Sequence, residues 1–195
     1  MSEQPICPVQ PPDYAPLMRD LVADGWSITS TINPRTPHLV AAVLRCPSSF
    51  LRMKIEQNTE TGTARSTIAT VTGGTSEPAR WYASAEAPPA RLWRDAARAA
   101  FHAQANRHEP PPFHPGATLK ALGWSYAHSC QDGRIVERYA DADGTRLLAH
   151  HHPLPAAPGM WTITRPGTSI GIAAIAAEPY ALPALILTLV LSEDA

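Results

Sequence analysis

The sequence predicts an α+β fold made of two tandem repeats, each an antiparallel meander sheet flanked by short helices, packed as a pseudo-twofold pair. Three observations support this prediction. The tripeptide Gly-Trp-Ser occurs twice, at 25–27 and 123–125. Short alternating or β-branched stretches follow each copy and are separated by turn residues. Each series then ends in an apolar run of helical length, at 92–101 and 182–191.

These signatures divide the chain into four segments. Residues 1–12 contain four prolines and are expected to form a flexible arm. Residues 13–107 form the first repeat and residues 117–195 the second, each with a helix, five strands and a helix. Residues 108–116 also contain four prolines and are predicted to be the linker between the repeats.

In the first repeat, a helix is expected at 14–23, where apolar residues recur at helical spacing and Gly25 follows. A second helix is expected at 92–101, after Pro88-Pro89, because proline is tolerated in the first turn of a helix. Strands are expected at 26–32, 39–44, 51–56, 66–71 and 81–85.

The strand at 51–56 shows the clearest alternation of apolar and charged residues. Successive side chains of a strand point to opposite faces of the sheet. The apolar set, expected to face the core, is Leu51, Met53 and Ile55. The charged set, expected to face water, is Arg52, Lys54 and Glu56.

In the second repeat, a short helix is expected at 118–122, ended by Gly123. Strands are expected at 124–129, 134–140, 146–152, 161–165 and 169–176. The last helix, at 180–191, is apolar nearly all round, and such a helix is buried on all sides. It is therefore expected to pack between the two halves or in an oligomer interface.

Composition excludes several classes of protein. The formal net charge is −1, so no global field draws the chain to nucleic acid or membrane, and such binding needs a local patch. The most apolar stretch, 181–191, is too short to span a bilayer. Cys7, Cys46 and Cys130 form no C-x-x-C pair and are expected to be unpaired thiols of a cytoplasmic protein.

Basic residues provide the candidate binding site. Fourteen of the sixteen Lys and Arg residues are Arg, whose planar guanidinium suits phosphates and stacks on bases. Aligned on the outward faces of adjacent strands beside an aromatic ring, they would form the kind of surface that binds single strands without sequence preference. The proposed nucleic-acid-binding residues are Arg45, Arg52, Lys54, Arg65, Arg80 and Tyr82 in the first repeat, and Arg134, Arg138 and Arg146 in the second.

The favoured function is therefore a non-enzymatic nucleic-acid-binding module, with single-stranded DNA as the expected ligand. The simpler alternative is a solvated sheet face on which Glu56, Glu60 and Glu137 balance the basic residues. A second alternative is a protein-interaction or assembly module, a homo-oligomer formed through the apolar C-terminal helix. No catalytic motif is legible: there is no G-x-S-x-G, and Gly-Gly-Thr-Ser at 73–76 lacks the Lys of a phosphate-binding loop.

The run of three histidines at 150–152 is the most conspicuous cluster. On a strand, His150 and His152 share a face and His151 points the other way. Two imidazoles at that spacing can hold zinc, and His128 and Cys130 of a neighbouring strand are the possible further ligands. The alternative is a solvated polar strand face. Since no clear third and fourth ligand is visible, neither a metal site nor a cofactor is predicted.

The pattern as a whole resembles the actinobacterial domain-of-unknown-function family 317, which is common in streptomycete genomes and often found in tandem. The matching features of the first copy are Gly25-Trp26, Asn33-Pro34, the strand 40–46 closed by Pro47, the strand 51–56, and Trp81-Tyr82-Ala83 leading to Pro88-Pro89. Those of the second copy are Gly123-Trp124, Asp143-Gly144, Trp161 and Glu178-Pro179, with Ile172 where the family usually shows Trp. The family name carries no activity.

A second resemblance concerns layout alone. Two strand-rich units, each closed by a helix, are similar to the Whirly and transcriptional-coactivator types of single-stranded DNA binder. This resemblance implies single-stranded DNA as the ligand, although a shared fold does not by itself carry a shared function.

Overall fold

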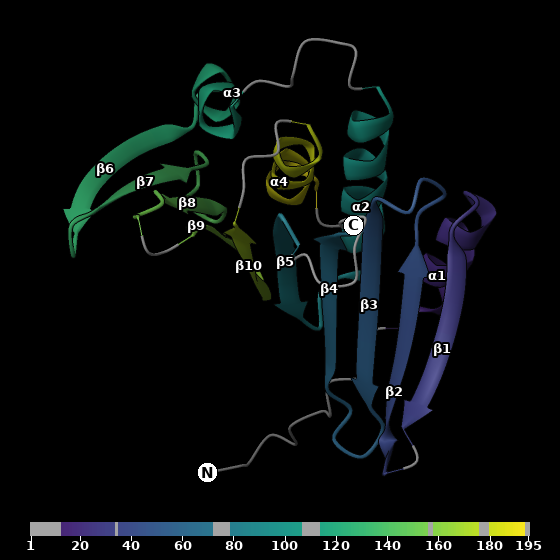
Figure 1. The fold of residues 1–195 in the computed structure, drawn as a ribbon. Coiled ribbons are helices and arrows are strands. Elements are labelled where there is room, and N and C mark those ends of the chain that lie inside the picture. The colour runs from purple at the N-terminus through teal and green to yellow at the C-terminus, as the bar shows by residue number, and fades with distance from the viewer. Residues whose placement is uncertain are drawn as a thin grey trace, which may run out of the picture.

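A computed structural model describes residues 13–33, 35–71, 79–106, 114–155, 158–175 and 180–193. These residues form an α+β fold with four helices and one ten-stranded antiparallel sheet (Figure 1). The predicted arm at 1–12, most of the predicted linker and Cys7 lie outside the described residues.

Both halves of the chain have the same order of elements, and the predicted helices and strands are confirmed to within a few residues. The first half contains α1 (Ala15–Ala23), β1 (Ser27–Asn33), β2 (Thr36–Arg45), β3 (Leu51–Asn58), β4 (Ala64–Thr70), β5 (Trp81–Glu86) and α2 (Ala90–Ala105). The second half contains α3 (Pro115–Ala121), β6 (Ser125–Gln131), β7 (Arg134–Ala140), β8 (Leu147–His151), β9 (Gly159–Arg165), β10 (Thr168–Ala174) and α4 (Ala181–Leu191).

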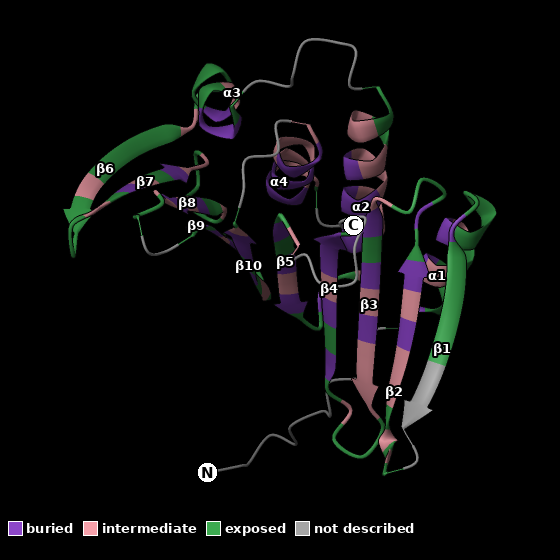
Figure 2. Ribbon diagram, viewed as in Figure 1, coloured by how far each residue is buried: buried purple, intermediate pink, exposed green. Residues whose placement is uncertain are grey.

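The strand order is β1-β2-β3-β4-β5-β10-β9-β8-β7-β6. Within each half, neighbouring strands are consecutive in sequence, as short turns favour. The halves join where β5 pairs antiparallel with β10, in a register that runs from Ala85 opposite Ile170 to Trp81 opposite Ala174. The sequence predicted a separate sheet for each repeat, whereas the ten strands form one sheet. Figure 2 shows that its edge strands, β1 and β6, are exposed along most of their described length.

All four helices pack on one face of this sheet. Inward side chains of the strands form a single core with residues of every helix, for example Leu17 of α1, Trp93 of α2, Leu119 of α3 and Leu185 of α4. In the centre, α2 and α4 pack against each other above the junction of β5 and β10 (Figure 1). The predicted burial of the last helix between the halves is confirmed.

Local sequence signals explain how the first helix meets the sheet. α1 is followed by Gly25 at φ +87°, a left-handed conformation that glycine adopts without steric cost. The Trp26 amide then donates to the Leu21 carbonyl at 3.0 Å. The Trp26 ring is buried and lies edge-to-face with Phe101 of α2, at 6.3 Å between ring centroids. Trp26 thus connects α1, β1 and α2.

Among the described residues, Cys46 is buried and Cys130 exposed, and both are free thiols, which confirms the prediction for these two. None of the helices in the described part of the chain has the length and apolar character that crossing a membrane requires.

The shared core makes a prediction about stability. Leu185→Ala should lower the free energy of unfolding of the whole chain by about 2–5 kcal/mol, because it removes a fully buried side chain from the core common to both halves. Urea unfolding followed by tryptophan fluorescence and circular dichroism measures this loss. The matched control Leu187→Ala removes the same atoms from a half-buried position on α4 and should cost less. Two separate transitions, only one of them shifted, would contradict a single core.

Candidate nucleic-acid interface

The face of the sheet opposite the helices is called here the open face. On β3 the predicted alternation is confirmed. Leu51, Met53 and Ile55 are buried, while the three residues that alternate with them are exposed or half-buried and lie on the open face. Because the sheet is antiparallel throughout, its register aligns outward residues of successive strands in rows that run across the strands.

Two such rows cross all ten strands through directly opposed residues. The first row, from β1 to β6, is Ser27, Arg45, Arg52, Ala69, Tyr82, Ala173, Met160, His151, Val136 and Ser129. The second row is Thr29, Val43, Lys54, Thr67, Ser84, Gly171, Thr162, Ala149, Arg138 and Ala127. Val136 is buried, so the exposed part of the first row ends near β8.

On the first half of the open face, four predicted residues lie close together. Arg45 and Arg52 are direct cross-strand partners on β2 and β3. Lys54, two residues along β3, forms an ion pair with Glu56 at 2.6 Å. Arg65 on β4 lies between the acidic residues Glu56 and Glu86 in the register. The net positive part of this half is therefore the end of the sheet with Arg45 and Arg52.

The middle of the open face is nearly neutral. Tyr82 on β5 is 41% exposed and has Ala69 and Ala173 as its cross-strand neighbours. Because these neighbours are small, they cover little of the phenol ring. Arg80, just before β5, is exposed, and its carbonyl accepts a hydrogen bond from the Ile175 amide at 2.7 Å.

The second half carries a smaller basic cluster beside a hollow. Arg134 and Arg138 lie on β7. Burial lowers the pKa of His151 on neighbouring β8, and the positive charges of these two arginines lower it further. Next to them, the open face over β6 to β9 is hollowed by a cavity of about 430 Å³, lined by Arg138, Thr162 and Thr164 among other residues. Arg138 donates from Nη1 to Ser129 Oγ at 2.8 Å, which holds its guanidinium across β6.

Arg146 is the predicted residue that the structure does not bring to this surface. It precedes β8 and donates from Nη1 to the Leu191 carbonyl at 3.3 Å, at the C-terminus of α4. Buried Arg165 donates to the Leu189 and Ser192 carbonyls at the same helix end, each at 2.6 Å. Cations near a helix C-terminus satisfy its free carbonyls and complement its dipole. Arg146 therefore anchors a helix on the opposite side of the sheet.

The open face thus carries two basic clusters rather than one continuous positive groove. The first is Arg45, Arg52 and Lys54, and the second is Arg134 and Arg138 with His151. Six strand spacings separate β3 from β7, or about 29 Å at the usual distance between strands. Tyr82 lies between the two clusters.

On the helix-covered face, the sequence predicted that His150 and His152 lie together but missed the third member of their cluster. Glu137 of β7, placed by sequence reasoning among the acids of the outward face, lies instead with His150 and His152. Burial raises the pKa of Glu137, but hydrogen bonds from His152 and Tyr126 outweigh it and hold that pKa at about 2. Burial, with the charge of His152, lowers the pKa of His150 to about 4, so this ring is neutral at neutral pH. The set is one carboxylate and two imidazoles, a donor set that holds divalent metals.

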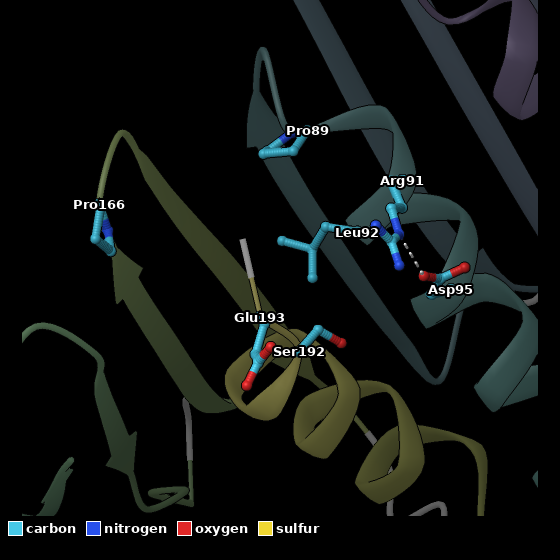
Figure 3. A pocket seen from close by; sticks show the side chains of 7 residues that line it. All are labelled: Pro89, Arg91, Leu92, Asp95, Pro166, Ser192 and Glu193. Atoms are coloured by element: carbon cyan, nitrogen blue, oxygen red, sulfur yellow. Dashed lines mark ion pairs between the residues drawn. The ribbon is translucent and has the colours of Figure 1, made fainter. Parts of the chain in front are cut away.

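A second hollow, of about 760 Å³, lies between the start of α2, the β9–β10 turn and the end of α4 (Figure 3). Its lining includes Arg91, which pairs with Asp95 at 3.9 Å, and Glu193. The lining carries two acidic side chains and one basic side chain, so the hollow has no preference for an anion.

Comparison of the chain with protein-family models, curated proteins and solved structures found no match. The resemblances drawn from sequence motifs and layout therefore stay predictions.

The open face predicts that its basic residues can be changed without loss of the fold. The double substitution Arg52→Ala with Lys54→Ala should alter the free energy of unfolding by no more than about 1 kcal/mol, because an exposed ion pair such as Lys54–Glu56 contributes little. Met53→Ala, between them but fully buried, should cost about 2–5 kcal/mol. Urea unfolding measures both. A double substitution as costly as Met53→Ala would mean that these side chains support the core.

Proposed function

We propose that this chain is a non-enzymatic module that binds single-stranded nucleic acid, in the first place DNA, on the open face of its sheet. The observation that carries the proposal is the face itself: it spans ten strands, none of the helices in the described residues covers it, and it has a basic cluster towards each end and an exposed tyrosine between them.

Each part of this surface has a physical role in the proposal. Arg45, Arg52 and Lys54 at one end, and Arg134 and Arg138 at the other, would neutralise phosphates and release counterions. Tyr82 would stack on a base, a contact that every base offers. The small residues beside Tyr82 allow the nucleic-acid backbone to approach the sheet. Arg146 has no part in this contact, because its guanidinium is bound to the end of α4.

We also propose that the two halves of the chain are equivalent units of a tandem repeat. Two features support a pseudo-twofold pair of equivalent units: each half runs helix, five strands, helix, and the strand order leads from either edge to the β5–β10 junction in the same succession. Such a pair would place one basic cluster from each unit on the same face, as a homodimer does with identical surfaces.

The alternative of an assembly module formed through the last helix has less support. Leu185 and Leu189, the residues expected to hold such an oligomer together, have no exposed surface and are used in the chain's own core. A partner would meet only the half-buried stripe of α4 that includes Leu187 and Leu191.

Fluorescence anisotropy with a labelled oligothymidine of about 20 nucleotides, longer than the sites usual for single-strand-binding folds, tests the proposal at low salt. Binding should be saturable, with a dissociation constant of about 10⁻⁶–10⁻⁴ M that weakens steeply with added salt. Arg52→Ala should weaken it and reduce the slope of log affinity against log salt by about 0.7 for the lost phosphate contact. Tyr82→Ala should cost about 1–3 kcal/mol, the usual value of one stacked base, with little change in slope.

Arg91→Ala is the matched control, because it removes another arginine, with 67% of its side chain exposed, from α2 on the other side of the sheet. It should leave both affinity and salt slope unchanged. A flat anisotropy curve at low salt with protein at about 10⁻⁴ M, the weak limit of non-specific binding, would overturn the proposal. So would equal losses from Arg52→Ala and Arg91→Ala, since binding would then follow total charge and not the open face.

A further inference from the structure

Glu137, His150 and His152 form a cluster that has no part in the proposed nucleic-acid contact. Its three residues come together through strand register. Glu137 of β7 lies directly opposite His150 of β8. His152 follows two residues later and therefore points to the same face as His150. This is the helix-covered face, so the cluster is separate from the open face and independent of the proposed function.

We propose that Glu137, His150 and His152 form a binding site for a divalent transition-metal ion, with Zn²⁺ the best fit to the ligands. Glu137 Oε2 lies 3.0 Å from His152 Nε2 and 3.5 Å from His150 Nδ1. All three ligand atoms lie within 4.8 Å of one another. In a tetrahedral zinc site with bonds of about 2.0–2.2 Å, ligand atoms lie about 3.3–3.5 Å apart. The three atoms are thus already close to the spacing that one ion requires.

An unsatisfied atom supports the same conclusion. Within the described part of the chain, the buried Nδ1 of His150 makes no hydrogen bond of good geometry, although Glu137 Oε2 lies 3.5 Å away. The side chain of His150 is only 10% exposed, and a buried polar atom left without a partner is unfavourable. In the neutral tautomer that carries its hydrogen on Nε2, Nδ1 presents a lone pair that can bind a cation. A metal ion between Nδ1 and the carboxylate would satisfy this atom.

The ligands are also held in place by their surroundings, as metal ligands usually are. The His150 ring stacks on Trp161, with centroids 3.6 Å apart and planes 2° from parallel. The Tyr126 hydroxyl donates to Glu137 Oε1 at 3.1 Å, which leaves Oε2 directed at the histidines. The cluster therefore needs little rearrangement to bind an ion.

Access and coordination number follow from exposure. The side chain of His152 is 38% exposed, so an ion can enter from solvent on that side. Three protein ligands leave a fourth position of the tetrahedron for water. His128, suggested from the sequence as a ligand, is exposed on β6 opposite Glu137, and it is not among the three residues whose ligand atoms converge.

Metal titration of the full chain, produced without a histidine tag and treated with a chelator, tests the site. Calorimetry with Zn²⁺ should give one ion per chain, and Co²⁺ should give the visible absorption of a tetrahedral complex. His152→Ala and Glu137→Gln should each weaken binding at least about 100-fold and abolish that absorption. Tyr126→Phe keeps all three ligands and should weaken binding about 10-fold, as loss of a supporting hydrogen bond does.

His151→Ala is the matched control, since it removes the middle histidine of the same run, which faces the other side of the sheet. Its metal affinity and Co²⁺ spectrum should equal those of the parent chain. Circular dichroism shows whether each variant is folded. Because His152 is half-exposed, His152→Ala is the substitution expected to disturb core packing least. Absence of stoichiometric binding by the parent chain would mean that the cluster is an ion pair only and would overturn the proposal. Binding weakened as much by His151→Ala as by His152→Ala would also overturn it.

Discussion

The backbone pairing of β5 with β10 is the interaction on which the rest of the structure depends. Without it, each half would end its own five-stranded sheet in an unpaired strand, and exposed edges of this kind pair with other chains. Because α2 follows β5 and α4 follows β10, the pairing also brings the two long helices together. The helices then cover the junction with apolar side chains. One core and one uninterrupted outer surface both result from this single contact between strands.

The two faces of the sheet serve different purposes, and the period of a β-strand keeps them apart. Inward positions carry large apolar side chains that fill the space under the helices. Outward positions carry a mixture of basic, acidic, small and exposed apolar side chains, the last including Met160 and Leu147. On β8, two adjacent histidines face opposite sides of the sheet. His150 lies beside Glu137 and Trp161 at the margin of the core. His151 lies near Arg134 and Arg138 on the open face. A change of one residue in the register of β8 would exchange these two environments.

Helix and strand positions could be predicted because they depend on local patterns, such as the alternation at 51–56. The joining of the halves could not, because hydrogen bonds between strands about ninety residues apart leave no mark in periodicity. Arg146 was assigned to the outer surface as part of a strand, yet its guanidinium binds the Leu191 carbonyl, 45 residues further along the chain. Glu137 was missed as a partner of His150 because that pairing depends on the length of the turn between β7 and β8.

Because α4 is synthesised after the other described helices, the order of the elements has a consequence for biosynthesis. The apolar side of α2, with Trp93 and Ala97, is complete long before Leu185 and Leu189 are made. At roughly 5–20 residues per second, the interval between the two helices lasts several seconds on the ribosome. During that time β5 is an unpaired edge and α2 has no helical neighbour at the junction. The apolar side of α2 therefore lacks its main partner in the core until α4 has emerged.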